Sequence, residues 1–212
     1  MQLFLDQFRD QPDVGGWVYV FRAMAMIHED EHRQDGMALL DRMLQDQQNF
    51  GNNPGALLQI HRVRGSAFYE NDEFEAAAAA YRDGLGIAPN DAELLNNLAY
   101  TLVEKLEDPE GALEYAERAA AAAPGQATIL DTLGWCQFRL GDTESAAQTL
   151  LDALTASRQP ADSATIRLHL GHVRLANGDV EGARNLARTV RTAMDEDPDL
   201  AEGNEEEYDR LM

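Results

Sequence analysis

Residues 94–102 read Leu94-Leu95-Asn96-Asn97-Leu98-Ala99-Tyr100-Thr101-Leu102, and the order of apolar and polar positions in this stretch decides the fold. Its leucines stand at positions 94, 95, 98 and 102, which is the spacing of one face of an α-helix. Two later stretches, residues 129–138 and 166–173, have similar apolar spacing. The sequence therefore predicts a series of amphipathic helices, each with one buried face.

Six of the seven prolines mark a repeat along the chain. They fall 42, 35, 35, 36 and 38 residues apart, at Pro12, Pro54, Pro89, Pro124, Pro160 and Pro198. A small residue keeps nearly the same period, with spacings of 34, 35 and 37, at Gly65, Ala99, Gly134 and Gly171. An alanine follows each of these by twelve residues, except after Ala99, where one extra residue shifts it to Ala112. Two markers with one period indicate an internal repeat.

Each repeat contains two predicted helices joined by a polar turn. The turns lie at residues 70–72, 106–109, 140–142 and 177–179. Their Asp and Asn residues can cap the helix that follows, and Gly permits the left-handed residue that ends a helix. The second helices are rich in alanine, as in residues 112–123. Alanine there, with a small residue in the first helix, predicts that the two helix backbones pack at close range.

Helix-turn-helix units of this length resemble the tetratricopeptide repeat (TPR) family, including a paired form common in bacterial proteins with several repeats. The unit from Leu58 to Pro89 supplies five residues at positions typical of the family, namely Gly65, Phe68, Ala77, Tyr81 and Pro89. Two features depart from the pattern. The family's tryptophan near the start of the unit is replaced by His61 or Arg167, and the first unit has a long turn from His28 to Gly36. The resemblance implies an all-α fold, a right-handed α-solenoid of about five units with partial units or caps at both ends.

We expect the repeat array to cover residues 1–198, followed by an acidic C-terminal tail or capping helix at 199–212. The expected units are 1–12 (partial), 15–54, 55–89, 90–124, 125–160 and 161–198. The first expected unit, residues 1–12, resembles the second helix of a repeat whose first helix is missing. The chain is therefore either a self-capped array or, as we favour, a fragment of a longer protein. At the other end, a short helix would place Tyr208, Leu211 and Met212 on one face. The nine acidic residues within 195–209 are expected to be solvated, or to form an arm that binds a basic partner or patch.

The charge of the chain excludes several functions. It has 17 Lys and Arg residues against 38 Asp and Glu residues, which gives a formal net charge of −21. Nucleic-acid phosphates and anionic membrane surfaces both require clustered basic residues, so neither is an expected partner.

The sequence contains no stretch long and apolar enough for a transmembrane helix, and its single cysteine, Cys136, cannot form an internal disulfide. The sequence favours neither the cytoplasm nor the periplasm, and no particular oligomeric state.

The resemblance also implies where a partner would bind. First helices of the family line a concave groove, and its groove-facing positions correspond here to Arg62, Tyr69, Asn96, Tyr100, Asp131, Trp135, Phe138, Arg139 and His172. Aromatic side chains interleaved with amides and arginines suit a protein or peptide partner. The alternative is structural. Tyr100 and Trp135 would then pack against the neighbouring unit. Asn96 and Asp131 would bond between adjacent first helices. The family's clamp for chaperone tails is not expected, since only Asn97 matches its motif.

One motif points to an enzyme. Residues 28–32 fit HExxH, the helical spacing that brings two imidazoles to one zinc ion with Glu29 as the base. The segment lies at the expected turn of the first unit and no third ligand follows, so an exposed helix end is favoured over a metal-dependent hydrolase that uses His28 and His32. His169 and His172 have no carboxylate beside them in the sequence and are expected on the surface or in the groove.

The sequence thus predicts a non-catalytic scaffold, without cofactor or metal, that holds a protein or peptide in its concave groove within a bacterial multiprotein assembly. The first alternative is an interaction module cut from a larger enzyme or envelope protein. The second is a metal-dependent hydrolase built on the HExxH-like segment.

Overall fold

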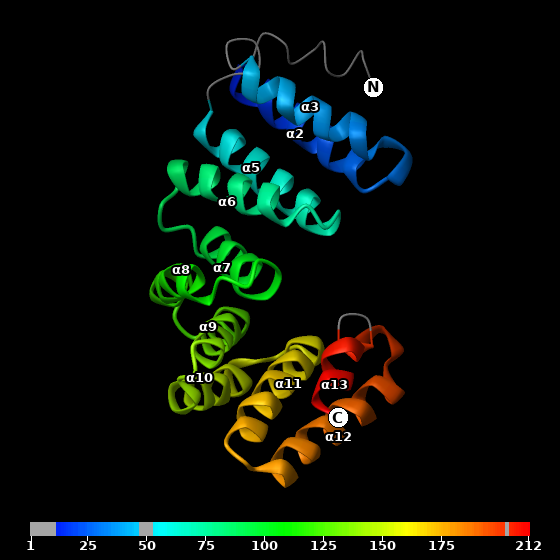
Figure 1. Cartoon of the computed structure of the whole chain (residues 1–212). Helices are drawn as coiled ribbons and strands as arrows, with labels where there is room; N and C mark the ends of the chain where they lie inside the picture. The colour runs from blue at the N-terminus through cyan, green and yellow to red at the C-terminus, as the bar shows by residue number, and fades with distance from the viewer. Residues whose placement is uncertain (1–11, 47–52, 202–203) are drawn as a thin grey trace. The chain divides into compact units, whose positions relative to one another are not determined.

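The computed structural model describes residues 12–46, 53–201 and 204–212, which form eleven α-helices and no β-strand (Figure 1). Ten of these helices make five consecutive pairs: α2 (Pro12–Ile27) with α3 (Arg33–Gln45), α5 (Pro54–Glu70) with α6 (Phe74–Ile87), α7 (Ala92–Tyr100) with α8 (Pro109–Ala122), α9 (Ala127–Arg139) with α10 (Thr143–Ala156), and α11 (Pro160–Ala176) with α12 (Val180–Glu196). The remaining helix, α13 (Glu205–Leu211), follows the last pair. The predicted all-α fold of five helix-turn-helix pairs is confirmed. None of the helices in the described ranges is long and apolar enough to cross a membrane.

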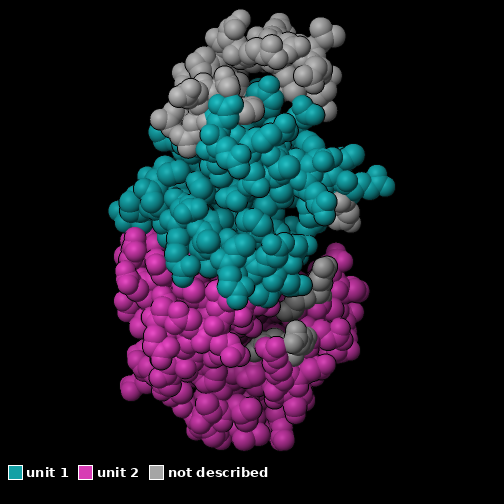
Figure 2. Space-filling model, turned by 45° about the horizontal axis from the view of Figure 1, so that its top comes forward, with its two compact units in different colours: residues 1–94 teal, residues 95–212 magenta. Residues whose placement is uncertain are grey.

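The chain divides into two compact units, residues 1–94 and 95–212, which Figure 2 colours separately. Helix α7 begins in unit 1 and continues into unit 2. In unit 1, α2 packs on α3 and α5 packs on α6, with Val20, Leu40 and Ile60 buried in the core. In unit 2, residues of α9, α10 and α11 share a core that includes Leu150 and Ile166. Each pair therefore buries its apolar face against its own partner helix and its neighbours.

Small residues set the distance between the two helices in the second and fourth pairs, as the sequence predicts, whereas Gly171 of the fifth pair faces Leu211 of α13. A Cβ atom added at Gly65 on α5 would overlap the ring of Tyr81 on α6. A Cβ atom at Gly134 on α9 would lie 2.7 Å from Cγ of Leu150 on α10. Any larger side chain at these positions would have to push the second helix away, because buried side chains are close-packed.

The turns inside the pairs use one recurring geometry. The residue two places before the second helix is left-handed in four of them, with φ of 60° at Asp72, 51° at Glu107, 87° at Gly141 and 81° at Gly178. The residue that directly precedes the helix then caps it in the last three pairs. The carboxylates of Asp108, Asp142 and Asp179 accept hydrogen bonds from backbone N–H groups three residues later, at 2.9, 3.1 and 2.9 Å. The predicted capping by turn residues is confirmed in these three pairs, whereas Glu73, which precedes α6, makes no side-chain capping hydrogen bond.

The third pair contains the extra residue that the repeat markers revealed. Its first helix ends in a π-helical turn, η2 (Thr101–Lys105), in which the N–H of Leu106 donates to the carbonyl oxygen of Thr101 at 3.1 Å. A π-helical turn holds one residue more than an α-helical turn at the same place. The insertion is therefore absorbed inside the first helix, and Asp108 still caps α8.

The first pair differs from its prediction at the turn. Helix α2 ends at Ile27, a short 3-10 turn η1 covers Asp30–His32, and α3 begins at Arg33. The predicted turn, from His28 to Gly36, was therefore too long. Gly36 lies inside α3, where an added Cβ atom would sit 2.8 Å from the carbonyl oxygen of Ala23. This glycine serves close helix packing rather than a turn. The partial unit expected at residues 1–12 lies outside the described residues, apart from Pro12.

The C-terminal segment folds back on the last pair. A 3-10 turn, η3 (Pro198–Leu200), leads to α13, which packs on both α11 and α12. Leu200 and Leu211 are buried in a cluster with Leu168 of α11. Met212 follows the end of α13 and is 63% exposed, so it does not share the buried face predicted for this helix.

Candidate functional site

The residues predicted to line a groove all lie on first helices. Arg62 and Tyr69 are on α5 in unit 1. In unit 2, α7 carries Asn96 and Tyr100, α9 carries the set Asp131, Trp135, Phe138 and Arg139, and α11 carries His172. We call the surface that these helices present within each unit the first-helix face. Its two parts differ in character.

In unit 1, the first-helix face contains an open cavity of about 190 Å³. Its wall combines apolar and polar side chains from α2, α5 and the start of α7: Met24, Ile27, His28, Gln59, Arg62, Val63, Ser66, Ala67, Glu70 and Glu93. Arg62 is the predicted groove residue that the structure places here. The cavity can therefore contact both the side chains and the polar backbone of a bound segment.

Acidic residues at the start of α7 hold Arg62 in place. One guanidinium nitrogen lies 3.1 Å from Oε2 of Glu93, and another pairs with Oδ2 of Asp91. The second carboxylate oxygen of Asp91 accepts a hydrogen bond of 3.0 Å from the backbone N–H of Leu94. Because Asp91 also anchors the first turn of α7, the position of the Arg62 side chain is tied to the backbone of the next helix.

Two other residues of α5 were singled out from the sequence. Tyr69 packs edge-on against Phe74 with ring centroids 5.4 Å apart, so it lies at the turn into α6 and does not line the cavity. His61 replaces the tryptophan expected from the family pattern. Burial lowers the pKa of His61, and the nearby carboxylate of Asp83 partly opposes this shift. The imidazole is therefore biased toward its neutral form.

In unit 2, the first-helix face holds an aromatic cluster around Trp135, which is only 5% exposed. The indole stacks on the imidazole of His169 on α11, with centroids 4.2 Å apart and planes inclined by 16°. It also stacks on Phe138 at 5.1 Å. Its Nε1–H donates to Oε2 of Glu104 at 2.8 Å. Trp135 therefore links η2, α9 and α11 through one side chain.

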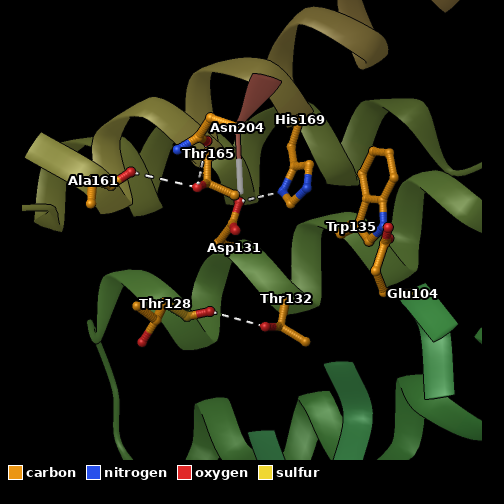
Figure 3. Close-up of polar contacts among 9 residues, drawn as sticks. All are labelled: Glu104, Thr128, Asp131, Thr132, Trp135, Ala161, Thr165, His169 and Asn204. Atoms are coloured by element: carbon orange, nitrogen blue, oxygen red, sulfur yellow. Dashed lines mark hydrogen bonds and ion pairs between the residues drawn. The ribbon is translucent and has the colours of Figure 1, made fainter. Parts of the chain in front are cut away.

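A buried polar pair lies beside this cluster. Nδ1 of His169 is 2.8 Å from Oδ1 of Asp131, and the two residues are 4% and 8% exposed (Figure 3). His169 was expected on the surface or in the groove, and this was wrong, because the side chain is buried and pairs with a carboxylate that does not stand beside it in the sequence. Asp131 is 38 residues away in the sequence but on the adjacent first helix. The repeat itself carried the missing signal, because the two residues occupy neighbouring positions of consecutive units.

Two further predicted groove residues of unit 2, His172 and Arg139, also lie against Trp135. His172 meets the indole edge-on at 5.8 Å, and the guanidinium of Arg139 lies 5.9 Å from the ring. Arg139 also donates to the carbonyl oxygen of Val103 at 3.2 Å. Trp135 thus packs against the neighbouring pair, and Asp131 bonds between adjacent first helices. These are the structural roles that were the alternative to lining a groove.

Asn96 and Tyr100 on α7 are both half-buried. The Oδ1 atom of Asn96 is buried and has no hydrogen-bond partner in the part of the chain that the structure describes. An unpaired buried acceptor is costly, so this amide is a point at which a further donor would be stabilising.

The enzyme-like motif does not have the geometry of a metal site. HExxH chelation requires both imidazoles on one continuous helix, whereas α2 ends at Ile27 and His32 closes the η1 turn. His32 instead lies 3.8 Å from Glu29, with both side chains largely exposed. Across the described residues, no three His, Cys, Asp or Glu side chains are grouped to hold a metal ion. Cys136 is buried, and burial raises the pKa of its thiol to about 12, so the thiol is poorly suited to act as a nucleophile.

The family model described as Tetratricopeptide repeat matches residues 62–127, 101–161 and 132–201. The TPR repeat-containing protein PA4667 of Pseudomonas aeruginosa is 26% identical over 168 residues, which are 79% of this chain and 26% of that protein. This chain therefore spans about a quarter of the length of that curated relative.

Two solved structures illustrate the similarity of the fold. MamA (residues 41 to the end) from Desulfovibrio magneticus RS-1 matches with a TM-score of 0.69 and 18% identity, covering 86% of this chain and 96% of that one. YrrB, described as a TPR protein with an unusual peptide-binding site, matches with a TM-score of 0.62 and 19% identity, covering 86% and 88%.

Proposed function

Because the chain belongs to the tetratricopeptide repeat family, we propose that it is a non-catalytic scaffold that binds a protein or peptide segment on its first-helix face. We propose further that it does so as part of a bacterial multiprotein assembly. The family supports the general role of a protein-binding scaffold. The face and the assembly are specific to this proposal.

The observation that carries the proposal is the open cavity of unit 1. Its apolar wall, with Met24 and Val63, can bury a side chain of a bound segment, while Gln59 and Ser66 offer hydrogen bonds to a peptide backbone. Arg62 is held rigidly by two carboxylates, so it loses little conformational entropy when a ligand binds. YrrB, a TPR protein of the same fold, has a described peptide-binding site, which supports this kind of ligand.

Site-specific photo-crosslinking tests the proposal. Benzoylphenylalanine is placed at Ser66 or at Glu70, which are exposed and line the cavity, and separately at Arg82, which is exposed on the second helix α6. In cells of the source organism, the first two positions are expected to capture the same protein, identified by mass spectrometry, and position 82 is expected to capture none of it. Equal capture from all three positions, or capture from position 82 alone, would contradict the proposed face.

A second candidate is that this chain is the interaction module of a larger polypeptide, an enzyme or an envelope protein. The observation in its favour is the curated relative, of which this chain matches only 26%. An immunoblot of the native organism with an antibody against this chain tests it. A band well above 23.5 kDa is expected. A single band at that mass would exclude the larger polypeptide.

A further inference from the structure

The first-helix face of the last pair is covered by the chain's own C-terminal segment. Leu168 on α11 stands three residues before Gly171, as Arg62 stands before Gly65 and Asp131 before Gly134. At this repeat position Arg62 lines the cavity of unit 1, but Leu168 is fully buried beneath Leu200 and Leu211.

Leu211 of α13 occupies a space that a second helix fills in other pairs. In the second and fourth pairs, the residue that faces the first-helix glycine stands sixteen places later, at Tyr81 and Leu150. Sixteen places after Gly171 the chain has only Ala187, which is too small to fill the same space. Instead, a Cβ atom added at Gly171 would lie 2.5 Å from Cδ2 of Leu211. The last pair therefore presents a pocket that α13 enters from outside the pair.

Polar contacts fix the direction of α13 on this surface. Before the helix begins, Oδ1 of Asn204 accepts a hydrogen bond of 3.0 Å from the hydroxyl of Thr165 (Figure 3). Near its end, Arg210 lies 3.8 Å from the carboxylate of Glu104, the same side chain that accepts the indole N–H of Trp135. The C-terminal segment thus contacts both α11 and η2, which Trp135 also links.

A third contact comes from α12. The guanidinium of Arg191 lies 5.8 Å from the ring centre of Tyr208 and 3.9 Å from the carboxylate of Glu205. The acidic arm therefore meets a basic residue of the preceding helix. The side chains that contact this surface are therefore an asparagine just before the helix, a tyrosine four residues later and a leucine three residues after the tyrosine.

The attachment of α13 is slight. The helix has seven residues, whereas isolated helices shorter than about 12–15 residues are unstable in water. Among the side chains described in the segment 204–212, Asn204 and Leu211 are buried and Tyr208 is partly buried against the same cluster. The ion pairs of the segment with Arg191 and Glu104 each include at least one side chain that is about half exposed or more. Exposed ion pairs contribute little to stability. A seven-residue helix that is held in this way can leave its place at a lower cost than the longer second helix of a pair.

We propose that the surface under α13, formed by Thr165, Leu168, Gly171, Arg191 and Glu104, is a binding site for a short acidic amphipathic helix. Helix α13 is its built-in occupant, and a partner helix with the same pattern of asparagine, tyrosine and leucine displaces it. This inference rests on the proposed function in one respect, namely that first helices form the binding face.

Binding of the segment in trans tests the inference. A chain that ends at Ala201 is titrated into a fluorescein-labelled peptide of residues 202–212, and binding is followed by fluorescence anisotropy. The shortened chain is expected to bind this peptide at least tenfold more tightly than the full-length chain does, because its site is vacant. A peptide with Leu211→Ala is expected to bind at least tenfold more weakly, and one with Met212→Ala, whose side chain is exposed, to bind as the natural peptide does.

Three results would overturn the inference: equal affinity of the two chains, no binding to a shortened chain that keeps its helical circular dichroism, or loss of that helical signal on shortening. Hydrogen exchange of the intact full-length chain gives an independent readout. Amides of α13 are expected to exchange at least ten times faster than those of α11, and equal protection would show that α13 is an integral part of the last pair. Neither measurement involves an external partner, so a failed crosslinking experiment at the cavity of unit 1 leaves this result standing, and the reverse also holds.

Discussion

Trp135 holds together several parts of unit 2 at the scale of a single residue. Its ring stacks on both Phe138 and His169, and its one polar atom donates to Glu104. A buried tryptophan provides a large apolar area, and its N–H needs a partner in the interior. Both requirements are met here, so the contribution of Trp135 to stability comes from packing first and from the hydrogen bond second.

Two substitutions separate these contributions. Trp135→Ala is expected to lower the free energy of unfolding by about 3–5 kcal/mol, since it removes the packed ring. Trp135→Phe keeps most of the ring but removes the indole N–H that donates to Glu104, and a smaller loss of about 1–3 kcal/mol is expected. Urea denaturation followed by circular dichroism measures both. Equal losses for the two variants would show that the ring itself contributes little.

At the scale of the elements, the turn between η2 and α8 carries a strained residue. Glu107 is left-handed with φ of 51°, at the place where the next two pairs have glycine. Left-handed backbone costs a residue with a side chain about 1–2 kcal/mol, and glycine's extra entropy in the unfolded chain costs about 0.5–1 kcal/mol.

Glu107→Gly is therefore expected to stabilise the protein by about 0.5–1 kcal/mol, measured as the shift of the urea midpoint at constant slope. The matched control is Glu117→Gly, an exposed position inside α8, which is expected to destabilise by about 1 kcal/mol. Destabilisation by both changes would mean that Glu107 makes a favourable contact that outweighs its backbone strain.

The cap of α10 makes stability depend on pH. Hydrogen bonds from the side chain and backbone of Ser145 lower the pKa of Asp142, so folding favours the ionised carboxylate. Its contribution is complete above the pKa of an unfolded aspartate, about 3.9, and is lost as the pH falls through the lower pKa of the folded state.

Asp142→Ala is expected to lower Tm by a few degrees at pH 7, and this difference from the natural chain should shrink as the pH is brought from 5 to 2. Asp142→Asn keeps a capping oxygen without a titratable group, so its Tm should lie close to that of the natural chain at pH 7. A difference between Asp142→Ala and the natural chain that does not change with pH would show that the ionised form of Asp142 has no special role.

The sequence patterns predicted some of these features correctly and missed others. The helix pairs, the capping residues and the small contact residues follow from local chemistry and a repeated period, so they could be read directly. Gly36 was misread because glycine in a turn and glycine at a helix crossing look the same in a sequence. The Asp131–His169 pair and the burial of Trp135 depend on how consecutive first helices align, and that alignment is a property of stacking rather than of any one repeat.

At the scale of the whole molecule, stability is distributed among pairs that contact mainly their neighbours. Gly134→Ala places a methyl group 2.7 Å from the buried side chain of Leu150 and is expected to cost about 1–3 kcal/mol. Hydrogen exchange followed by mass spectrometry should show faster exchange in α9, α10 and α11, with α2 and α3 unchanged.

The control for this local effect is Gly86→Ala. An added Cβ atom at Gly86 meets nothing within 4 Å, and the residue lies in a helix, so the change should stabilise by about 0.5–1 kcal/mol. If Gly134→Ala instead accelerated exchange evenly along the chain, the pairs would unfold as one cooperative body.

The π-helical turn at Thr101–Lys105 has a consequence for how such a protein changes over evolutionary time. Because an inserted residue is accommodated as a wider loop of the same helix, the cap at Asp108 and the start of α8 keep their places. A codon gained at this point is therefore neutral for the architecture, and a codon lost would restore an ordinary α-helical turn. A bulge of this kind lets one repeat gain a residue while its capping geometry stays the same.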